Sequence, residues 1–153
     1  IGIYWNNHHH LFQLVETTSG AALWANLHLL FWLSLLPLTT GWMDDSGLAR
    51  VPVAVYGADL VAAAIAWMIL QRVIMRSQGE LSELHAAVGR DAKGRISPVL
   101  YLIAIVSALV VMPVWEPAVW ISIACYVAVA AMWVIPDRRI ERYLAQRDRA
   151  GEA

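Results

Sequence analysis

Four long apolar runs, separated by short segments rich in charged or turn-forming residues, constrain this chain more than any other feature of its sequence. Each run approaches the roughly 20 apolar residues that a helix needs to cross the hydrocarbon core of a bilayer. Lipid offers no hydrogen-bond partners to an exposed backbone, so runs of this length are expected to be helical. The sequence therefore predicts an all-α, polytopic transmembrane helical bundle, with spans at residues 21–38, 53–74, 96–114 and 118–135.

A fifth helical segment is predicted at residues 1–15, which are too few and too polar to cross a bilayer. We interpret this segment as the end of a helix whose beginning is missing, so that the chain holds five readable helical segments of a six-helix subunit. On this interpretation residues 1–136 form the transmembrane domain and residues 137–153 form a charged cytoplasmic tail. The second segment is expected to end near Pro37 and to be followed by a loop over residues 39–50, which contain several turn-forming residues.

Composition agrees with a membrane environment. Hydrophobic residues make up 59% of the chain and charged residues 15%, and the mean hydropathy is +0.55, whereas soluble domains average about 45–50% apolar and about 25% charged residues. The net charge of −1 gives no support to a nucleic-acid-binding function. The single cysteine, Cys125, excludes an intrachain disulfide. The sequence contains no recognisable catalytic or metal-ligand pattern, so we expect neither enzymatic activity nor a cofactor or bound metal.

The distribution of basic residues predicts the orientation in the membrane. Five of the 11 Lys and Arg residues fall in the connector 71–95 and five in the tail, which leaves only Arg50. Because basic residues collect on the cytoplasmic side, the connector 71–95 and the tail are expected to face the cytoplasm. The loop 39–50 and a tight hairpin at residues 113–117 are then expected to face outward.

Three consecutive histidines, His8, His9 and His10, lie in the first segment. Consecutive residues of a helix point about 100° apart, so the three side chains cannot all bind one ion. We expect one or two of them to hydrogen-bond to neighbouring helices, and a metal site is the alternative.

Three further polar residues lie within the predicted spans. Asn26 and His28 are expected to bond across a helix interface, because an unpaired polar group is costly in lipid. Asp59 lies about 9 Å into the third segment, at about 1.5 Å per residue. It is either a cation-attracting charge at an outer vestibule or a side chain bonded to Tyr56 or to another helix.

Short motifs in the first 60 residues resemble the transmembrane protein 175 family, the endosomal and lysosomal potassium channels and their prokaryotic homologues. The family pattern Tyr-Trp-x-Asn-His-His-x-x-Phe, which lies in its second helix, matches Tyr4, Trp5, Asn7, His8, His9 and Phe12. The next helix continues the resemblance with Leu23-Trp24-Ala25-Asn26 and Ser34-Leu35-Leu36-Pro37, and Tyr56-Gly57 is similar to the start of the fourth.

This resemblance implies a potassium-permeable channel that assembles as a homotetramer in a prokaryotic cell membrane and conducts potassium and other monovalent cations. The family's pore is lined by apolar residues of the first helix, whose Arg-x-x-x-Phe-Ser-Asp motif bonds to polar residues of the next two helices. By this analogy His8, His9 and Asn26 form a structural polar network that supports the pore helix. Phe-Ser-Asp is absent from this chain, so the pore-lining filter residues cannot be assigned within it.

Two other classes of function remain open at this point. A transporter or metal-handling membrane protein would use His8, His9, His28 and Asp59, and it would need these groups to converge on one cavity. A non-conducting membrane module, such as a sensor or scaffold, would show no ion flux at all.

Overall fold

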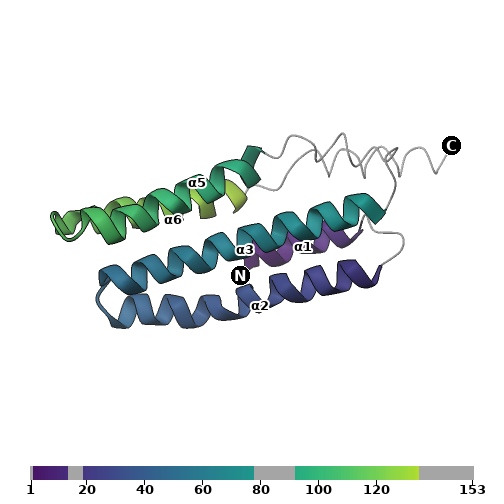
Figure 1. Cartoon of the computed structure of the whole chain (residues 1–153), viewed down its shortest axis with the longest axis horizontal. Coiled ribbons are helices and arrows are strands. Elements are labelled where there is room, and N and C mark those ends of the chain that lie inside the picture. The colour runs from purple at the N-terminus through teal and green to yellow at the C-terminus, as the bar shows by residue number, and fades with distance from the viewer. Residues whose placement is uncertain (1, 14–18, 78–91, 135–153) are drawn as a thin grey trace.

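The computed structural model describes residues 2–13, 19–77 and 92–134, and within these residues every regular element is a helix (Figure 1). Four helical segments are long and apolar enough to cross a membrane. The multi-pass helical architecture predicted from the apolar runs is therefore confirmed. In chain order the elements are α1 (Gly2–Gln13), α2 (Gly20–Asp45), α3 (Arg50–Ser77), α5 (Ala92–Val106), the π-helical turn η1 (Ser107–Val111), the 3-10 turn η2 (Glu116–Ala118) and α6 (Val119–Val134).

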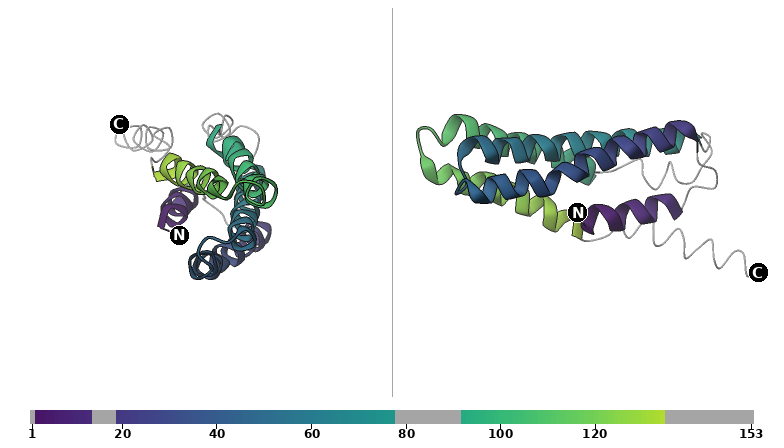
Figure 2. Two further views of the ribbon diagram at one scale, coloured as in Figure 1. Left: turned by 90° about the vertical axis from the view of Figure 1, so that its left-hand side faces the viewer. Right: turned by 90° about the horizontal axis from the view of Figure 1, so that it is seen from below.

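The long helices form two antiparallel hairpins, α2 with α3 and α5 with α6 (Figure 1). Helix α3 is central, because it packs against α2 on one side and against α5 on the other. Seen end-on in Figure 2, the helices curve into a C shape, and α1 lies on the open side next to α6. Helix α1 covers only the half of the bundle in which α2 begins and α3 ends (Figure 2).

Helix α2 extends well beyond the predicted end of its span. Ser19 caps its start, since the side-chain oxygen accepts a hydrogen bond from the Ala22 backbone nitrogen at 3.2 Å. The prediction that the helix ends near Pro37 is wrong, because α2 continues through Pro37 to Asp45. Proline removes one backbone hydrogen bond, but helices of membrane proteins tolerate this loss where hydroxyl side chains and neighbouring helices bind the freed groups. The expected loop at residues 39–50 is correspondingly reduced to a short turn before Arg50.

The predicted span at residues 96–114 comprises α5 and the π-helical turn that extends it. Two buried hydroxyl groups join this span to the returning helix. Ser107 Oγ donates to the carbonyl oxygen of Ala118 at 2.9 Å, and Ser122 Oγ donates to that of Ala104 at 2.8 Å. The turn between them corresponds to the predicted hairpin.

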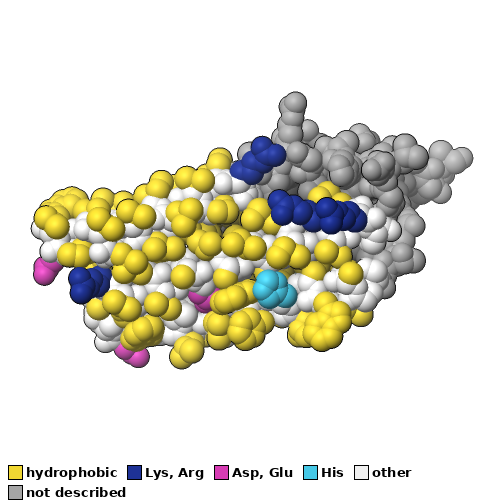
Figure 3. All heavy atoms as spheres, viewed as in Figure 1, with side chains coloured by type: hydrophobic (Ala, Val, Ile, Leu, Met, Phe, Trp, Pro, Cys, Tyr) yellow, Lys and Arg dark blue, Asp and Glu magenta, His cyan; other side chains and the backbone are white. Residues whose placement is uncertain are grey.

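The core lies along one face of α3, where apolar side chains recur every three or four residues. Val53, Ala63, Leu70 and Ile74 are completely buried there. The faces of α2, α5 and α6 that point away from this core expose large apolar side chains. Figure 3 shows this apolar surface on one side of the molecule. A surface of this kind is expected to contact lipid or other subunits rather than water.

The described basic residues lie toward the ends of the helices. Arg72 and Arg76 end α3, and Lys93 and Arg95 begin α5 at the same end of the bundle. Arg50 lies at the other end, at the start of α3. Residues 14–18, 78–91 and 135–153 lie outside the described residues, and they include the middle of the predicted connector and the whole predicted tail.

Candidate functional site

The first polar contact joins α1 to α2. His8 Nε2 lies 2.6 Å from Asn26 Oδ1, and both groups are partly buried. The neutral imidazole fits this contact as the tautomer that carries its proton on Nε2, so that the histidine donates and the amide oxygen accepts. The His8 ring also packs on Phe12, with a centroid separation of 4.7 Å. The two helices are therefore held by a specific hydrogen bond as well as by apolar packing.

Two further histidines have described side chains, His9 and His28. His9 is exposed, as expected for a residue that points about 100° away from His8, and the side chain of His10 lies outside the described part of the chain. His28 is exposed on α2 and accepts a hydrogen bond from Trp32 Nε1 of the same helix at 3.0 Å. The expected bond from His28 to another helix is therefore replaced by a local one, because residues four apart on a helix lie on the same face.

Asp59 is a buried side chain of α3, with 5% of its surface exposed. Its Oδ2 accepts a hydrogen bond from Thr39 Oγ1 of α2 at 3.0 Å. Of the alternatives open at the sequence level, the observed contact is the one to another helix. Within the described residues, no group of three or more His, Cys, Asp or Glu side chains could hold a metal ion. His8, His28 and Asp59 each bond to a different partner.

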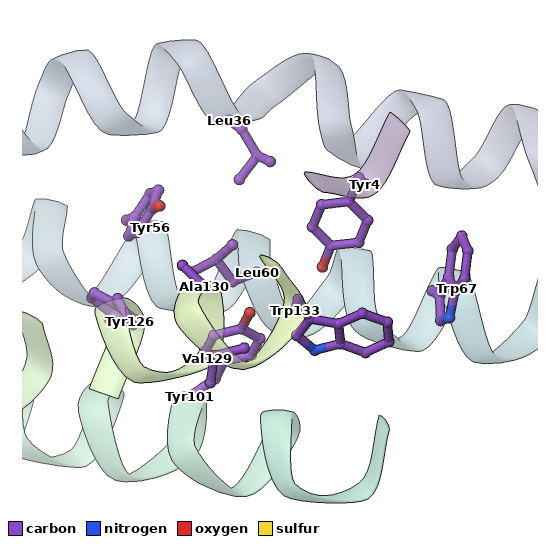
Figure 4. Close-up of a pocket in the computed structure, with 10 residues that line it drawn as sticks. All are labelled: Tyr4, Leu36, Tyr56, Leu60, Trp67, Tyr101, Tyr126, Val129, Ala130 and Trp133. Carbon is purple, nitrogen blue, oxygen red and sulfur yellow. The ribbon is translucent and has the colours of Figure 1, made fainter. Parts of the chain in front are cut away.

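An aromatic cavity of about 110 Å³ lies between the helices. Its lining residues belong to α1, α2, α3, α5 and α6. Figure 4 shows that the hydroxyls of Tyr4 and Tyr101 point toward each other. Tyr4 also makes an edge-on contact with Trp67, with ring centroids 6.4 Å apart. The lining residues are Tyr4, Leu36, Tyr56, Leu60, Trp67, Tyr101, Tyr126, Val129, Ala130 and Trp133.

Two hydrogen bonds hold aromatic side chains of this cavity in place. Tyr126 Oη donates to the carbonyl oxygen of Val53 at 2.8 Å, and Trp133 Nε1 donates to Ser97 Oγ at 2.9 Å. Gly57 makes room for Tyr126, because a Cβ atom added at this glycine would collide with the tyrosine hydroxyl. Sequence reasoning missed this cluster. Its members are spread from the first helix to the last, and each reads individually as an ordinary apolar residue of a span.

The fold and these contacts define a multi-pass helical membrane protein in which polar side chains of the spans bond to backbone carbonyls or to other side chains. The family model described as the endosomal/lysosomal potassium channel TMEM175 matches residues 1–37. A protein named a potassium channel, from Chryseobacterium sp. (strain P1-3), is 48% identical over 146 residues, which cover 95% of this chain and 72% of the relative. The chain therefore belongs to the TMEM175 family, and membership of this channel family means that it is not an enzyme. No solved structure matches the chain.

Proposed function

We propose that this protein is the subunit of a potassium-permeable cation channel in the cell membrane. The observation that carries this proposal is the 48% identity to a protein named a potassium channel, which extends over 95% of the chain. Conduction would be passive, down the electrochemical gradient of the ion. A hydrophobic constriction on an oligomer axis would gate the pore by controlling its hydration.

A pore between subunits fits this chain better than a pore within one subunit. The cavity inside the bundle has a volume of only about 110 Å³, and aromatic and aliphatic side chains form its walls. A potassium ion that loses its hydration shell needs oxygen ligands in return, and the only side-chain oxygens among these lining residues are four tyrosine hydroxyls. We therefore propose a homotetramer with the pore on its symmetry axis, as the family resemblance implies. The pore-lining helix would lie outside residues 1–153, because this chain lacks the Phe-Ser-Asp motif.

His8 and Asn26 would position the helices that support this pore. Their 2.6 Å contact joins α1 to α2, and rotation of either helix would break it. An unpaired polar group in lipid costs about 1–3 kcal/mol, so the pair favours one rotational setting of the two helices. His9, exposed on another side of α1, would be the residue of this segment that reaches a further helix.

The test is potassium flux into proteoliposomes that contain the purified full-length protein. We expect flux that follows the potassium gradient, does not saturate as a carrier does, and does not require a second ion. His9→Leu should reduce flux or assembly without releasing a metal. Flux that is strictly coupled to another ion would contradict the channel proposal and favour a transporter. Stoichiometric zinc or copper that is lost in His9→Leu would favour a metal-handling protein. A complete lack of flux from correctly assembled protein would favour a non-conducting module.

A further inference from the structure

Asp59 is the only acidic residue among the described ones whose side chain is buried, since Asp44, Asp45 and Glu116 are exposed. It lies nine residues after the start of α3, or ~14 Å along the helix at about 1.5 Å per residue. An ionised carboxylate inside a membrane span is costly and needs a partner of opposite charge or several hydrogen-bond donors.

Within the described residues, the surroundings of Asp59 supply only one donor. Thr39 Oγ1 lies 3.0 Å from Oδ2, whereas Oδ1 is completely buried without a hydrogen-bond partner. The closest basic residue along α3 is Arg50, ~14 Å away. On α2, His28 is eleven residues from Thr39, or ~17 Å along the helix. A salt bridge therefore does not stabilise the carboxylate in this part of the chain.

Among the described residues, two phenols interact electrostatically with Asp59. Tyr56 lies one turn earlier on α3, and Tyr4 approaches from α1. From α2 the facing group is the hydroxyl of Thr39, which does not titrate. Neutral phenols carry no positive charge, so they cannot neutralise the carboxylate.

The hydroxyl of Thr39 has one hydrogen and three acceptors within reach. Besides Asp59 Oδ2, its Oγ1 lies 3.2 Å from the carbonyl oxygen of Leu35 and 3.3 Å from that of Leu36. If Asp59 is ionised, the threonine gives its hydrogen to the carboxylate, and Oδ1 retains half a negative charge without any donor. If Asp59 is protonated, its Oδ2–H donates to Thr39 Oγ1, and the threonine hydrogen is free for a carbonyl of its own helix. Both arrangements use every available hydrogen, but only the protonated one leaves no buried charge.

We propose that Asp59 and Thr39 form a membrane-embedded proton-binding site, with a neutral Asp59 as the hydrogen-bond donor that joins α3 to α2. The site lies two residues from Pro37, where α2 lacks one of its backbone hydrogen bonds. Loss of the proton leaves a buried charge at this weakened point and loosens the contact between the two helices. The proposal stands independently of potassium conduction, because it concerns a proton and its test does not measure flux.

The direct test is infrared spectroscopy of the protein in lipid bilayers, with aspartate labelled with carbon-13 at its carboxyl group. We expect the carbonyl band of a protonated carboxylic acid at pH 7, shifted by the label. Asp59→Asn should remove this band, whereas Asp44→Asn, which alters an exposed carboxylate, should retain it. Absence of the band from the wild type at pH 7 would overturn the proposal. So would a band that appears only after potassium is withdrawn, since this would indicate a cation site. The wild-type measurement does not depend on the folding of any variant.

Two threonine variants test the hydrogen-bond partner. Thr39→Val removes the acceptor of the acid hydrogen, so the band should move to the frequency of a weakly bonded acid. Thr40→Val is the matched control, because the Thr40 hydroxyl bonds to the carbonyl oxygen of Leu36 and should leave the band unchanged. Equal effects of the two substitutions would refute the assigned geometry.

The dependence of unfolding on pH provides an independent readout. A folded state that retains one proton more than the unfolded state loses stability as pH rises, and the unfolding equilibrium constant increases up to tenfold per pH unit. We expect the wild type to lose stability in this way as pH rises, and we expect Asp59→Asn to lack this part of the pH dependence. An identical pH dependence in the two proteins would contradict the proposal.

Discussion

Gly57→Ala should destabilise the bundle, although alanine is the better helix former. An added Cβ would lie 2.8 Å from Ile105 Cγ1 and would collide with the Tyr126 hydroxyl. Tyr126 would have to move, and its 2.8 Å hydrogen bond to the carbonyl oxygen of Val53 would break.

The size of this effect follows from three opposing contributions. Replacing glycine by alanine inside a helix gains about 1 kcal/mol. Overpacking a close contact costs about 1–3 kcal/mol, and leaving the buried hydroxyl of Tyr126 without a partner costs about 1–3 kcal/mol more. The expected net loss for Gly57→Ala is therefore about 1–5 kcal/mol.

Gly41→Ala is the matched control. Gly41 also lies inside a long helix, but an added Cβ would meet no atom within 4 Å. The free energy of unfolding of this variant should rise by up to about 1 kcal/mol, because only the helix propensity changes. Reversible unfolding in mixed detergent micelles, followed by tryptophan fluorescence, measures both free energies of unfolding.

A double substitution tests the proposed cause. Tyr126→Phe removes the hydroxyl that an added Cβ would meet first, so Gly57→Ala should cost less in a Tyr126→Phe background than in the wild type. The difference is the coupling energy of a double-mutant cycle. Equal costs in the two backgrounds, or equal stabilities of Gly57→Ala and Gly41→Ala, would refute the reasoning.

Further predictions concern the proposed channel. His8→Leu and Asn26→Leu should each lower the free energy of unfolding by about 1–3 kcal/mol and reduce potassium flux in proteoliposomes. The loss of stability in the double mutant should not exceed the sum of the two single losses. Wild-type flux in both single variants would mean that the two side chains only fill space. In a Cys125→Ser background, an impermeant thiol reagent applied to intact cells should label a cysteine at Asp45 and not one at Ala92, and the reverse pattern would invert the proposed topology. Native mass spectrometry of the full-length protein in nanodiscs should give the mass of a tetramer, and the mass of a monomer would contradict the proposed pore on an oligomer axis.

Hydropathy alone was sufficient to predict the class of fold. The apolar runs were long enough to span lipid, and in lipid the backbone must satisfy its own hydrogen bonds, so the prediction of a multi-pass helical bundle needed no tertiary information. The end of α2 could not be predicted in the same way. Proline commonly ends a helix in a soluble protein, but α2 continues past Pro37, where threonine hydroxyls bond to backbone carbonyls.

The partners of the polar residues depended on the tertiary structure. The sequence indicated that Asn26, His28 and Asp59 needed hydrogen bonds, because unpaired polar groups are costly in a span. It could not indicate that His28 bonds within its own helix while Asp59 bonds to Thr39 of another. That choice depends on how each helix is rotated about its axis, and packing against the other helices sets this rotation.

The aromatic cavity was decided entirely by the tertiary structure. Tyr4 and Trp133 lie near opposite ends of the chain, yet both line the same space. Tyrosine and tryptophan in a membrane span can face lipid, a helix interface or a cavity with little difference in local sequence. The packing of α1, α2, α3, α5 and α6 around this space brings these rings together, and Gly57, whose missing side chain admits Tyr126, makes room for one of them.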